Sequence, residues 1–344
     1  MTGESRFEAD PEELVDPEEV GGLPDGWTVG VPDRPEDVDR LVALLRDHET
    51  AGRGWPGAGR EDVLVEVAGL RTRQNVVVRD ATGLAQAWGS VHDRAGGRML
   101  FLHVVGRDLP EGLGRACSDV LVEWAVGQAR EVGAARGLPV QQIDTGAFAD
   151  DERQHRWLAA SGFERVRTWW QMSRSVTPDE ATLVPSPEHW ADRGVTYRLA
   201  DGEDDHRTVH DVLEAAFTDH FNSKPETFEE FLHRLREDPG HRWDHWWLAE
   251  LDGDPVVPAG ALVGTASGSG SYVAYIGVVE VARGRGVAKN LLRTVIADAA
   301  SRGRDRVGLE VDADSETGAH HLYRSMGWET SYVTESWHRD VPVH

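Results

Sequence analysis

The two halves of this 344-residue chain repeat the same order of local patterns. Residues 99–105 (MLFLHVV) and 272–279 (YVAYIGVV) are apolar runs typical of buried strands, and each precedes a glycine-containing loop and an amphipathic stretch. Later in each half a glycine, Gly162 or Gly327, stands directly before an aromatic residue. A repeat of about 150 residues has the length of one ordinary domain. We therefore predict two tandem copies of a single domain.

Composition sets the boundaries of these copies. The first twenty residues, MTGESRFEADPEELVDPEEV, are acidic and lack an apolar central run, so we expect a disordered arm rather than a signal or transit peptide. Residues 176–192 are rich in proline and polar residues without a period, which is typical of a linker. We expect an acidic arm (1–23), a first copy (24–175), the linker (176–192) and a second copy (193–344). Each copy should have α/β (α+β) architecture, with a mixed, mostly antiparallel sheet flanked by helices.

Charge and cysteine content argue against several classes of protein. The net charge of -24 disfavours nucleic-acid binding, which needs clustered positive charge, and no apolar run of about 18 residues indicates a membrane helix. Cys117 is the single cysteine, so no intrachain disulfide forms, and its place in an apolar helical pattern predicts a buried thiol. The histidines lack HExxH-like spacing, so we expect no metal site. We expect a cytoplasmic monomer or homodimer without nucleic-acid or membrane partners.

Residues 282–292 (ARGRGVAKNLL) place basic side chains and glycines between a predicted strand and a predicted helix. The first N–H groups of a helix have no partner within it and attract anions. Glycines let a ligand approach the backbone, while arginine and lysine supply donors for phosphate oxygens. We predict a diphosphate-binding loop, although the GxGxxG and GxxxxGK[ST] patterns are both absent. A solvated polar turn is the alternative.

A second motif follows at the expected distance. Arg283, Gly286 and Ala288 fit the pattern [QR]-x-x-G-x-[GA], and the stretch LYRSMGW (322–328) fits L-Y-x-x-x-G-[FW]. In this order the two motifs resemble those of the GNAT superfamily of acyl-CoA-dependent N-acetyltransferases, over roughly residues 193–335. The duplicated layout is similar to that of tandem-domain, mycothiol-synthase-like members. The resemblance implies transfer of an acetyl group from acetyl-CoA to a primary amine of a small molecule, by direct attack in a ternary complex.

The resemblance also implies roles for individual residues. Val278 and Val279, at the end of the fourth strand, would pair with the pantetheine arm of coenzyme A in the manner of an added strand. Tyr323 would be the general acid that protonates the departing thiolate, although a core aromatic side chain is the alternative reading. The coenzyme A pyrophosphate would be held by the loop residues Arg283, Gly284, Arg285, Gly286, Val287, Ala288 and Lys289.

The general base stays open at this level. The family often uses a glutamate early on the fourth strand, where this chain has Tyr272. His220, Glu280 and Glu310 are the candidates, and each is also compatible with a solvated polar residue that takes no part in the reaction.

The first copy has lost the corresponding functional residues. Leu109 stands where the second copy has Arg283, and Leu158 stands where it has Tyr323. We therefore expect catalysis in the second copy, with the first serving a structural or acceptor-shaping role. The acidic surface slightly favours a cationic acceptor. Two other functions stay open: a protein or peptide N-acetyltransferase, and a non-catalytic regulatory module that binds acyl-CoA.

Overall fold

The computed structural model describes residues 22–34, 36–68, 73–94, 98–182, 194–218, 225–267, 270–315 and 318–343. Nearly all of the predicted acidic arm, and residues 183–192 of the predicted linker, lie outside these ranges. The start of the linker forms a short 3-10 turn, η2 (Pro178–Thr182), which packs against the helix that follows the basic loop.

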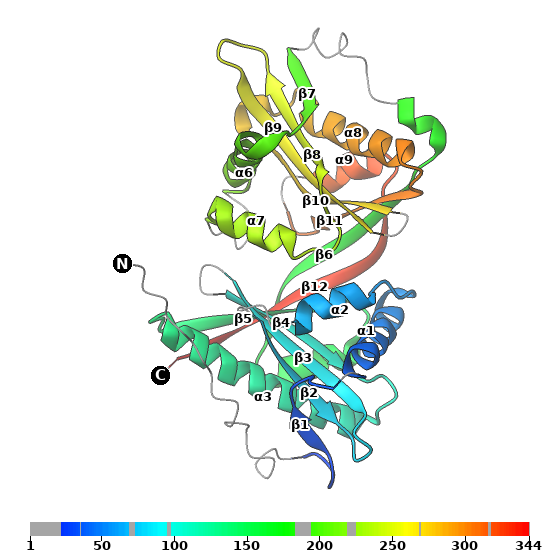
Figure 1. Ribbon diagram of the computed structural model, residues 1–344, viewed down its shortest axis with the longest axis vertical. Coiled ribbons are helices and arrows are strands. Elements are labelled where there is room, and N and C mark those ends of the chain that lie inside the picture. The colour runs from blue at the N-terminus through cyan, green and yellow to red at the C-terminus, as the bar shows by residue number, and fades with distance from the viewer. Residues whose placement is uncertain are drawn as a thin grey trace.

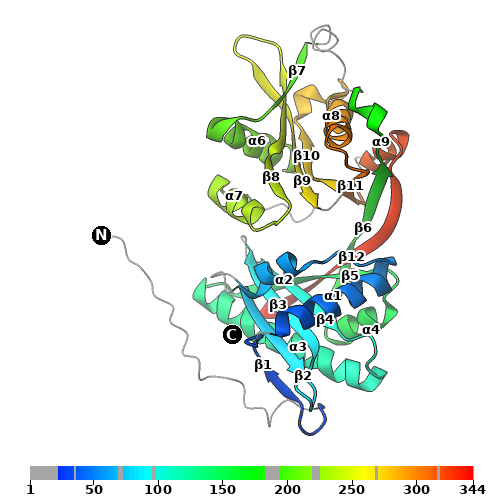
Figure 2. The ribbon, with the colours of Figure 1, turned by 45° about the vertical axis from the view of Figure 1, so that its right-hand side comes forward.

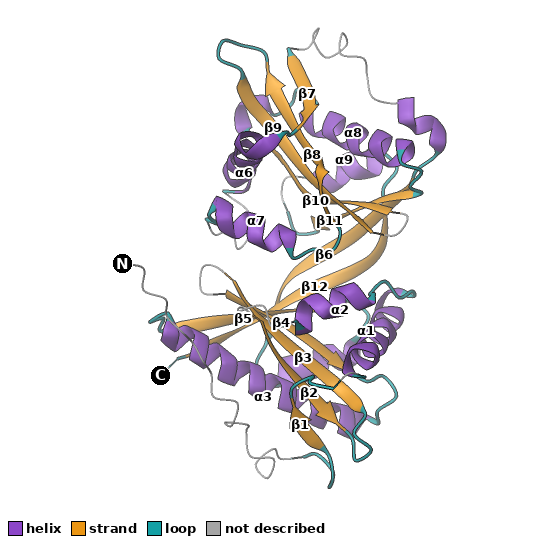
Figure 3. Cartoon of the chain, viewed as in Figure 1, coloured by secondary structure: helices purple, strands orange, loops and turns teal. Residues whose placement is uncertain are grey.

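The two halves of the chain contain the same elements in the same order (Figures 1 and 3). The first half comprises β1 (Thr28–Gly30), α1 (Asp37–Arg53), α2 (Arg60–Val67), β2 (Arg73–Arg79), β3 (Ala85–Arg94), β4 (Arg98–Val105), α3 (Glu111–Ala135), β5 (Val140–Phe148), α4 (Glu152–Ala160) and β6 (Glu164–Ser175). The second comprises β7 (Val195–Leu199), α6 (Gly202–Phe217), α7 (Phe228–Arg236), β8 (His241–Leu251), β9 (Val257–Ser267), β10 (Gly270–Val278), η3 (Glu280–Ala282), α8 (Val287–Ser301), β11 (Arg306–Asp312), α9 (Ala319–Ser325) and β12 (Glu329–Pro342).

The described strands form one 12-stranded sheet rather than the two separate sheets that the repeat suggests. Its order is β1-β2-β3-β4-β5-β12-β6-β11-β10-β9-β8-β7. Only the β4–β5 and β10–β11 pairs are parallel, which confirms the predicted mixed, mostly antiparallel arrangement. In Figure 1, β6 and β12 cross between the upper and lower halves of the molecule as two long adjacent ribbons.

The last strands of the two copies are exchanged. β12, from the second copy, pairs with β5 of the first over Thr334–Pro342, and β6 pairs with β11 over Trp169–Ser175. Packing follows the pairing: Trp337 of β12 lies in a core of first-copy residues, and Met172 of β6 lies in a core of second-copy residues. Each copy is therefore completed by a strand that the sequence assigns to the other.

Helices cover both faces of the sheet in each copy (Figure 2). In the second copy, α8 packs on one face through Val287, Leu291 and Val295, whereas α6 and α7 pack on the other around Trp246. The capping box of α7, in which Thr227 and Glu230 exchange hydrogen bonds with the backbone, fixes where that helix begins.

An ion pair joins the two copies away from the exchanged strands. Arg73 on β2 donates a hydrogen bond of 2.8 Å to Glu237, which directly follows α7, and both side chains are more than nine-tenths buried. Arg73 also bonds to Glu66 on α2. Because removing one partner of a buried ion pair leaves an uncompensated charge, this contact helps to fix how the two copies meet.

Candidate active site

The parallel strands β10 and β11 part in the middle of the second copy. Their pairing runs from Gly270–Arg306 to Val273–Leu309 and then stops, while a bulge lies between Val273 and Tyr275 on the other edge of β10. Beyond this point, as far as the described strands go, β10 pairs only with β9. The edge that faces β11 therefore has backbone groups outside the ladder, available to an extended ligand.

The predicted strand-end residues lie along this open stretch. Val278 pairs with Gly260 of β9, and the Val279 N–H donates to the Ala259 carbonyl at 3.0 Å. Both valine side chains pack against the core of the second copy. The prediction that a strand ends here is confirmed. The backbone of Val278 and Val279 borders the space between β10 and β11 in which an added strand would run.

The basic loop has an ordered backbone between η3 and α8. The Arg283 N–H donates to the Glu280 carbonyl at 3.1 Å, which closes η3. Gly284 and Gly286 have φ of 77° and 79°, in the left-handed region that favours glycine. Gly286 caps α8, so the N–H groups of Val287, Ala288 and Lys289 point out of the helix start without partners in the helix, and the first helical bond runs from the Asn290 N–H to the Gly286 carbonyl. The predicted boundary between loop and helix is confirmed.

The loop leaves room for an anionic group. The side chains of Arg283, Arg285 and Lys289 are exposed, and within the described ranges none of them takes part in an ion pair or side-chain hydrogen bond. A Cβ built on Gly284 would meet no atom within 4 Å. Free N–H groups, two arginines and an open backbone suit the pyrophosphate of coenzyme A, so the residues present fit this co-substrate.

Tyr323 lies on α9 in the same core cluster as Val287 of α8 and the strand-end valines. The side chain is only 7% exposed, and burial raises the pKa of its phenol to about 12. No described residue forms a hydrogen bond with its hydroxyl. At neutral pH the residue is a neutral phenol that can donate one proton. Both the predicted core packing and the predicted acid chemistry are compatible with this environment.

Glu310 occupies the first position of β11 beyond its last pairing with β10. Gln171 of β6 donates a hydrogen bond to its carboxylate. Glu310 is exposed on the surface, and the protein around it partly desolvates its carboxylate. This desolvation raises the pKa; the Gln171 hydrogen bond opposes the increase and the charge of Asp312 adds to it. A raised pKa makes this carboxylate, at the point where the strands part, a better proton acceptor than a fully solvated glutamate.

A cavity of about 620 Å³ lies beside this point. Tyr272, at the position where the family often has glutamate, lines it and is 37% exposed. Desolvation and then the neighbouring Glu310 carboxylate raise the pKa of the Tyr272 phenol, so this residue stays neutral. Tyr272 therefore forms part of the cavity wall and does not replace the missing carboxylate as a base.

Other walls of the cavity come from segments that the repeat pattern assigns elsewhere. Trp55, which follows α1 of the first copy, and Tyr332 of the exchanged strand β12 both line it. Their rings meet edge to face with centroids 5.7 Å apart, and the Arg53 guanidinium lies over both. These residues were missed by sequence reasoning because no motif marks them and they reach the cavity only through the exchange.

The other candidate bases have different positions. Glu280 is exposed at the start of η3, beside the loop, where its carbonyl rather than its carboxylate has a structural role. His220 lies outside the described residues. Neither glutamate lines the cavity, but Glu310 lies next to its wall: Leu309, which precedes it on β11, and Gln171, which is hydrogen-bonded to it, both line the cavity.

The corresponding channel in the first copy is filled by its own side chains. Gly106, directly after β4, corresponds to Val279, directly after β10. The Gly106 N–H donates to the Gln86 carbonyl of β3, as the Val279 N–H donates to the Ala259 carbonyl of β9. The Arg153 guanidinium donates to the Gly106 carbonyl at 3.0 Å and also contacts the carbonyls of Arg107 and Leu109. Gly318 occupies the matching position in the second copy, at the start of α9. The first copy has closed the stretch that stays open in the second.

Three further features concern the single thiol, metal ligands and helix length. Cys117 is fully buried, as predicted, and burial raises its pKa to about 12, so it is not a reactive thiolate. Among the described residues, no set of three or more His, Cys, Asp or Glu side chains gathers as metal ligands. None of the helices in the described ranges has the length and apolar content that crossing a lipid bilayer requires.

Comparison with known proteins agrees with the motifs. Residues 207–328 match the acetyltransferase (GNAT) family. A mycothiol acetyltransferase of Thermobispora bispora is 31% identical over 197 residues, which cover 54% of this chain and 64% of the relative. A mycothiol acetyltransferase of Beutenbergia cavernae is 27% identical over 324 residues, covering 92% of this chain and 96% of the relative.

Solved structures extend the similarity over both copies. A GCN5-related N-acetyltransferase from Sphaerobacter thermophilus has a TM-score of 0.74 and 27% identity, covering 93% of this chain and 97% of its own. A tandem GNAT protein from the clavulanic acid biosynthesis pathway has a TM-score of 0.65 at 14% identity, covering 91% of this chain and 98% of its own, and shares the fold. Residues 207–328, in the second copy, therefore match the GNAT acetyltransferases, and the similarity to a solved GCN5-related N-acetyltransferase extends over both copies.

Proposed function

We propose that the second copy transfers an acetyl group from acetyl-CoA to a primary amine of a small molecule, by direct attack within a ternary complex. The observation that carries this proposal is the parting of β10 from β11 directly before a glycine-arginine loop and a helix start. In the first copy, Arg153 blocks the matching stretch and Leu158 replaces Tyr323. This asymmetry supports catalysis in residues 193–344 and a supporting role for residues 24–175.

The residues of the second copy have separate tasks in this proposal. The loop from Arg283 to Lys289 holds the pyrophosphate through backbone N–H groups and guanidinium donors. Val278 and Val279 position the pantetheine arm with their backbone groups. When bound, acetyl-CoA supplies the activated thioester. Tyr323 then provides the proton that the departing sulfur takes up.

We assign the general base to Glu310 in preference to Glu280 and His220. The assignment rests on its place at the point where the strands part, beside the cavity that contains Tyr272. Its raised pKa brings the carboxylate closer to the range in which it can take a proton from an ammonium group. Gln171 would hold the carboxylate in place through its hydrogen bond.

We place the acceptor in the 620 Å³ cavity, whose volume suits a small molecule rather than a folded protein segment. The aromatic side chains of Trp55, Tyr272 and Tyr332 offer flat surfaces for a ring or an alkyl chain. Since several relatives are named mycothiol acetyltransferase, non-acetylated mycothiol is the first acceptor to assay. The acidic chain favours a cationic amine.

Release of free thiol from acetyl-CoA, measured against a panel of amines, tests the proposal. The panel should contain non-acetylated mycothiol, amino sugars, polyamines and peptides with free N-termini. Saturable thiol release with a small amine is expected. Release with peptides alone would favour the peptide N-acetyltransferase, and tight binding of coenzyme A without release for any amine would favour a binding module.

A further inference from the structure

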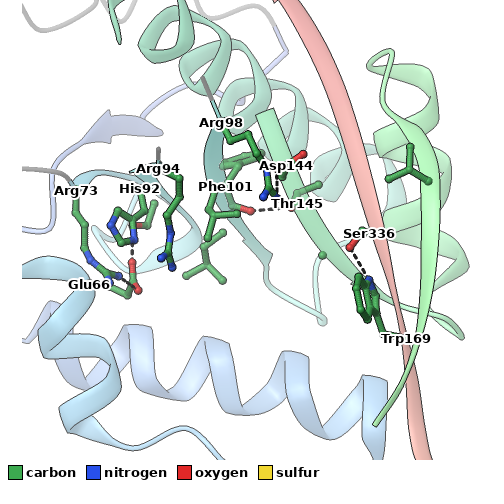
Figure 4. A pocket seen from close by; sticks show the side chains of 15 residues that line it. Glu66, Arg73, His92, Arg94, Arg98, Phe101, Asp144, Thr145, Trp169 and Ser336 are labelled. Carbon is green, nitrogen blue, oxygen red and sulfur yellow. Dashed lines mark hydrogen bonds and ion pairs between the residues drawn. The ribbon is translucent and has the colours of Figure 1, made fainter. Parts of the chain in front are cut away.

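The first copy has a cavity of its own, of about 480 Å³, at the point where its strands β4 and β5 part. The last paired residues of these strands, Phe101 and Thr145, both line it. Figure 4 shows Arg73, Arg94 and Arg98 gathered around this cavity. Its volume is ordinary for a small-molecule site, yet the Arg153 side chain closes the channel through which coenzyme A would reach it.

Two of the three arginines are neutralised by carboxylates. Arg73 bonds to Glu66 and Glu237, and Arg98 donates to Asp144 at 2.6 Å. The Arg73 group of three residues and the Arg98–Asp144 pair leave little positive charge for a ligand. These contacts hold the Arg73 and Arg98 side chains in place, and the Arg73–Glu237 bond links the cavity wall to the second copy.

No carboxylate in the described ranges pairs with Arg94. Its Nε is shielded from water without a hydrogen bond, and no described residue forms an ion pair with its guanidinium. Burial, and then the cation of Arg234, lower its pKa, which reflects the cost of this charge. His92 beside it adds no second cation, because burial lowers the His92 pKa to about 4 and keeps the ring neutral. A partly buried cation without a paired carboxylate is costly because burial removes its hydration.

We propose that this cavity is a second small-molecule site, which binds an organic anion through a carboxylate or phosphate group at Arg94. A planar guanidinium matches either group with two parallel hydrogen bonds. Leu100, Leu102 and Trp169 supply an apolar wall for the rest of the molecule. Because the first copy has neither an open cofactor channel nor a tyrosine at the position of Tyr323, where it has Leu158, the site binds its ligand without acetyl transfer. The proposal does not depend on the acceptor or the base assigned above.

Calorimetric titration with succinate, and separately with inorganic phosphate, tests the site at low ionic strength. The full chain would carry Arg283→Gln and Arg285→Gln, so that the loop before α8 does not contribute a second anion site. Into this background we introduce Arg94→Gln, which removes the charge, or Arg60→Gln as the matched control. Arg60 pairs with Asp39 on the exposed surface of the same copy.

Saturable binding of at least one anion is expected, and Arg94→Gln should weaken it by at least tenfold, since hydrogen bonds to a charged group are worth about 1.5–3 kcal/mol. Arg60→Gln should bind as the parent does. The melting temperature of Arg94→Gln without ligand should equal or exceed that of the parent, because an uncompensated cation is removed. Absence of saturable binding for both anions, or equal binding by Arg94→Gln and the parent, would overturn the proposal.

Discussion

Replacing Tyr323 with phenylalanine removes one hydroxyl and leaves the ring in place. The ring packs in the core of the second copy, with its centroid 6.2 Å from that of the Trp328 ring, and phenylalanine preserves that packing. Since no described residue is hydrogen-bonded to the hydroxyl, its loss leaves no partner unsatisfied. We therefore expect the free energy of unfolding to change by less than about 1 kcal/mol.

The effect on catalysis should be much larger. A positioned general acid contributes about 10²–10⁴-fold, so kcat should fall by that factor, equivalent to about 3–5 kcal/mol of activation free energy. The affinity for acetyl-CoA should stay the same, because the hydroxyl acts on the departing sulfur and not on the pyrophosphate. Because burial raises the phenol pKa to about 12, loss of this proton should cause no fall in wild-type activity below about pH 10.

Steady-state thiol release, with the acceptor identified from the amine panel, measures this change. Tyr197→Phe is a matched control, since it removes another hydroxyl of the second copy, one that receives a hydrogen bond from Asn290. The control should retain kcat within about threefold, below the range expected for a catalytic acid. Full activity of Tyr323→Phe would refute the reasoning, and so would a loss that appears only in the affinity for acetyl-CoA.

Glu310→Gln should lower kcat by about 10²–10⁴-fold and remove the acid limb of the pH profile. Because the folded protein raises the Glu310 pKa, the ionised carboxylate lowers the stability of the protein at a pH above that pKa. In urea unfolding the variant should therefore be at least as stable as the parent at pH 8, and the difference between the two should shrink in acid. Gly286→Ala should weaken acetyl-CoA binding in calorimetry. Gly303→Ala, just after α8, is the control: it imposes a similar backbone strain of about 1 kcal/mol but should leave this binding unchanged. Glu237→Gln should lower the free energy of unfolding by about 1.5–3 kcal/mol in urea, because Arg73 loses a buried partner, and an unchanged value would show that the pair does not join the copies.

Local patterns predicted the elements around the site well. The apolar run at 272–279 and the helical period after Gly286 correspond closely to β10 and α8. Glycine at 284 and 286 marked positions where the backbone adopts positive φ. These features depend on neighbouring residues, so the sequence carries them directly.

The strand exchange was beyond the reach of the same reasoning. β6 and β12 are both long strands with similar patterns. Either of them could form a hydrogen-bonded ladder with β5 or with β11, so the local pattern does not choose between the two pairings. The cavity walls at Trp55 and Tyr332 depend on this choice. The closed channel of the first copy was likewise hidden, because Arg153 gives no signal until the fold brings it to the carbonyl of Gly106.

The central claim is that only the second copy holds the acetyl donor, and calorimetric titration with acetyl-CoA tests it most directly. We predict one equivalent bound per chain. Arg283→Gln combined with Arg285→Gln should weaken this binding at least tenfold, whereas Arg115→Gln, in the corresponding helix start of the first copy, should leave it unchanged. Two equivalents per chain, or binding lost in Arg115→Gln and retained in the double variant, would contradict the claim.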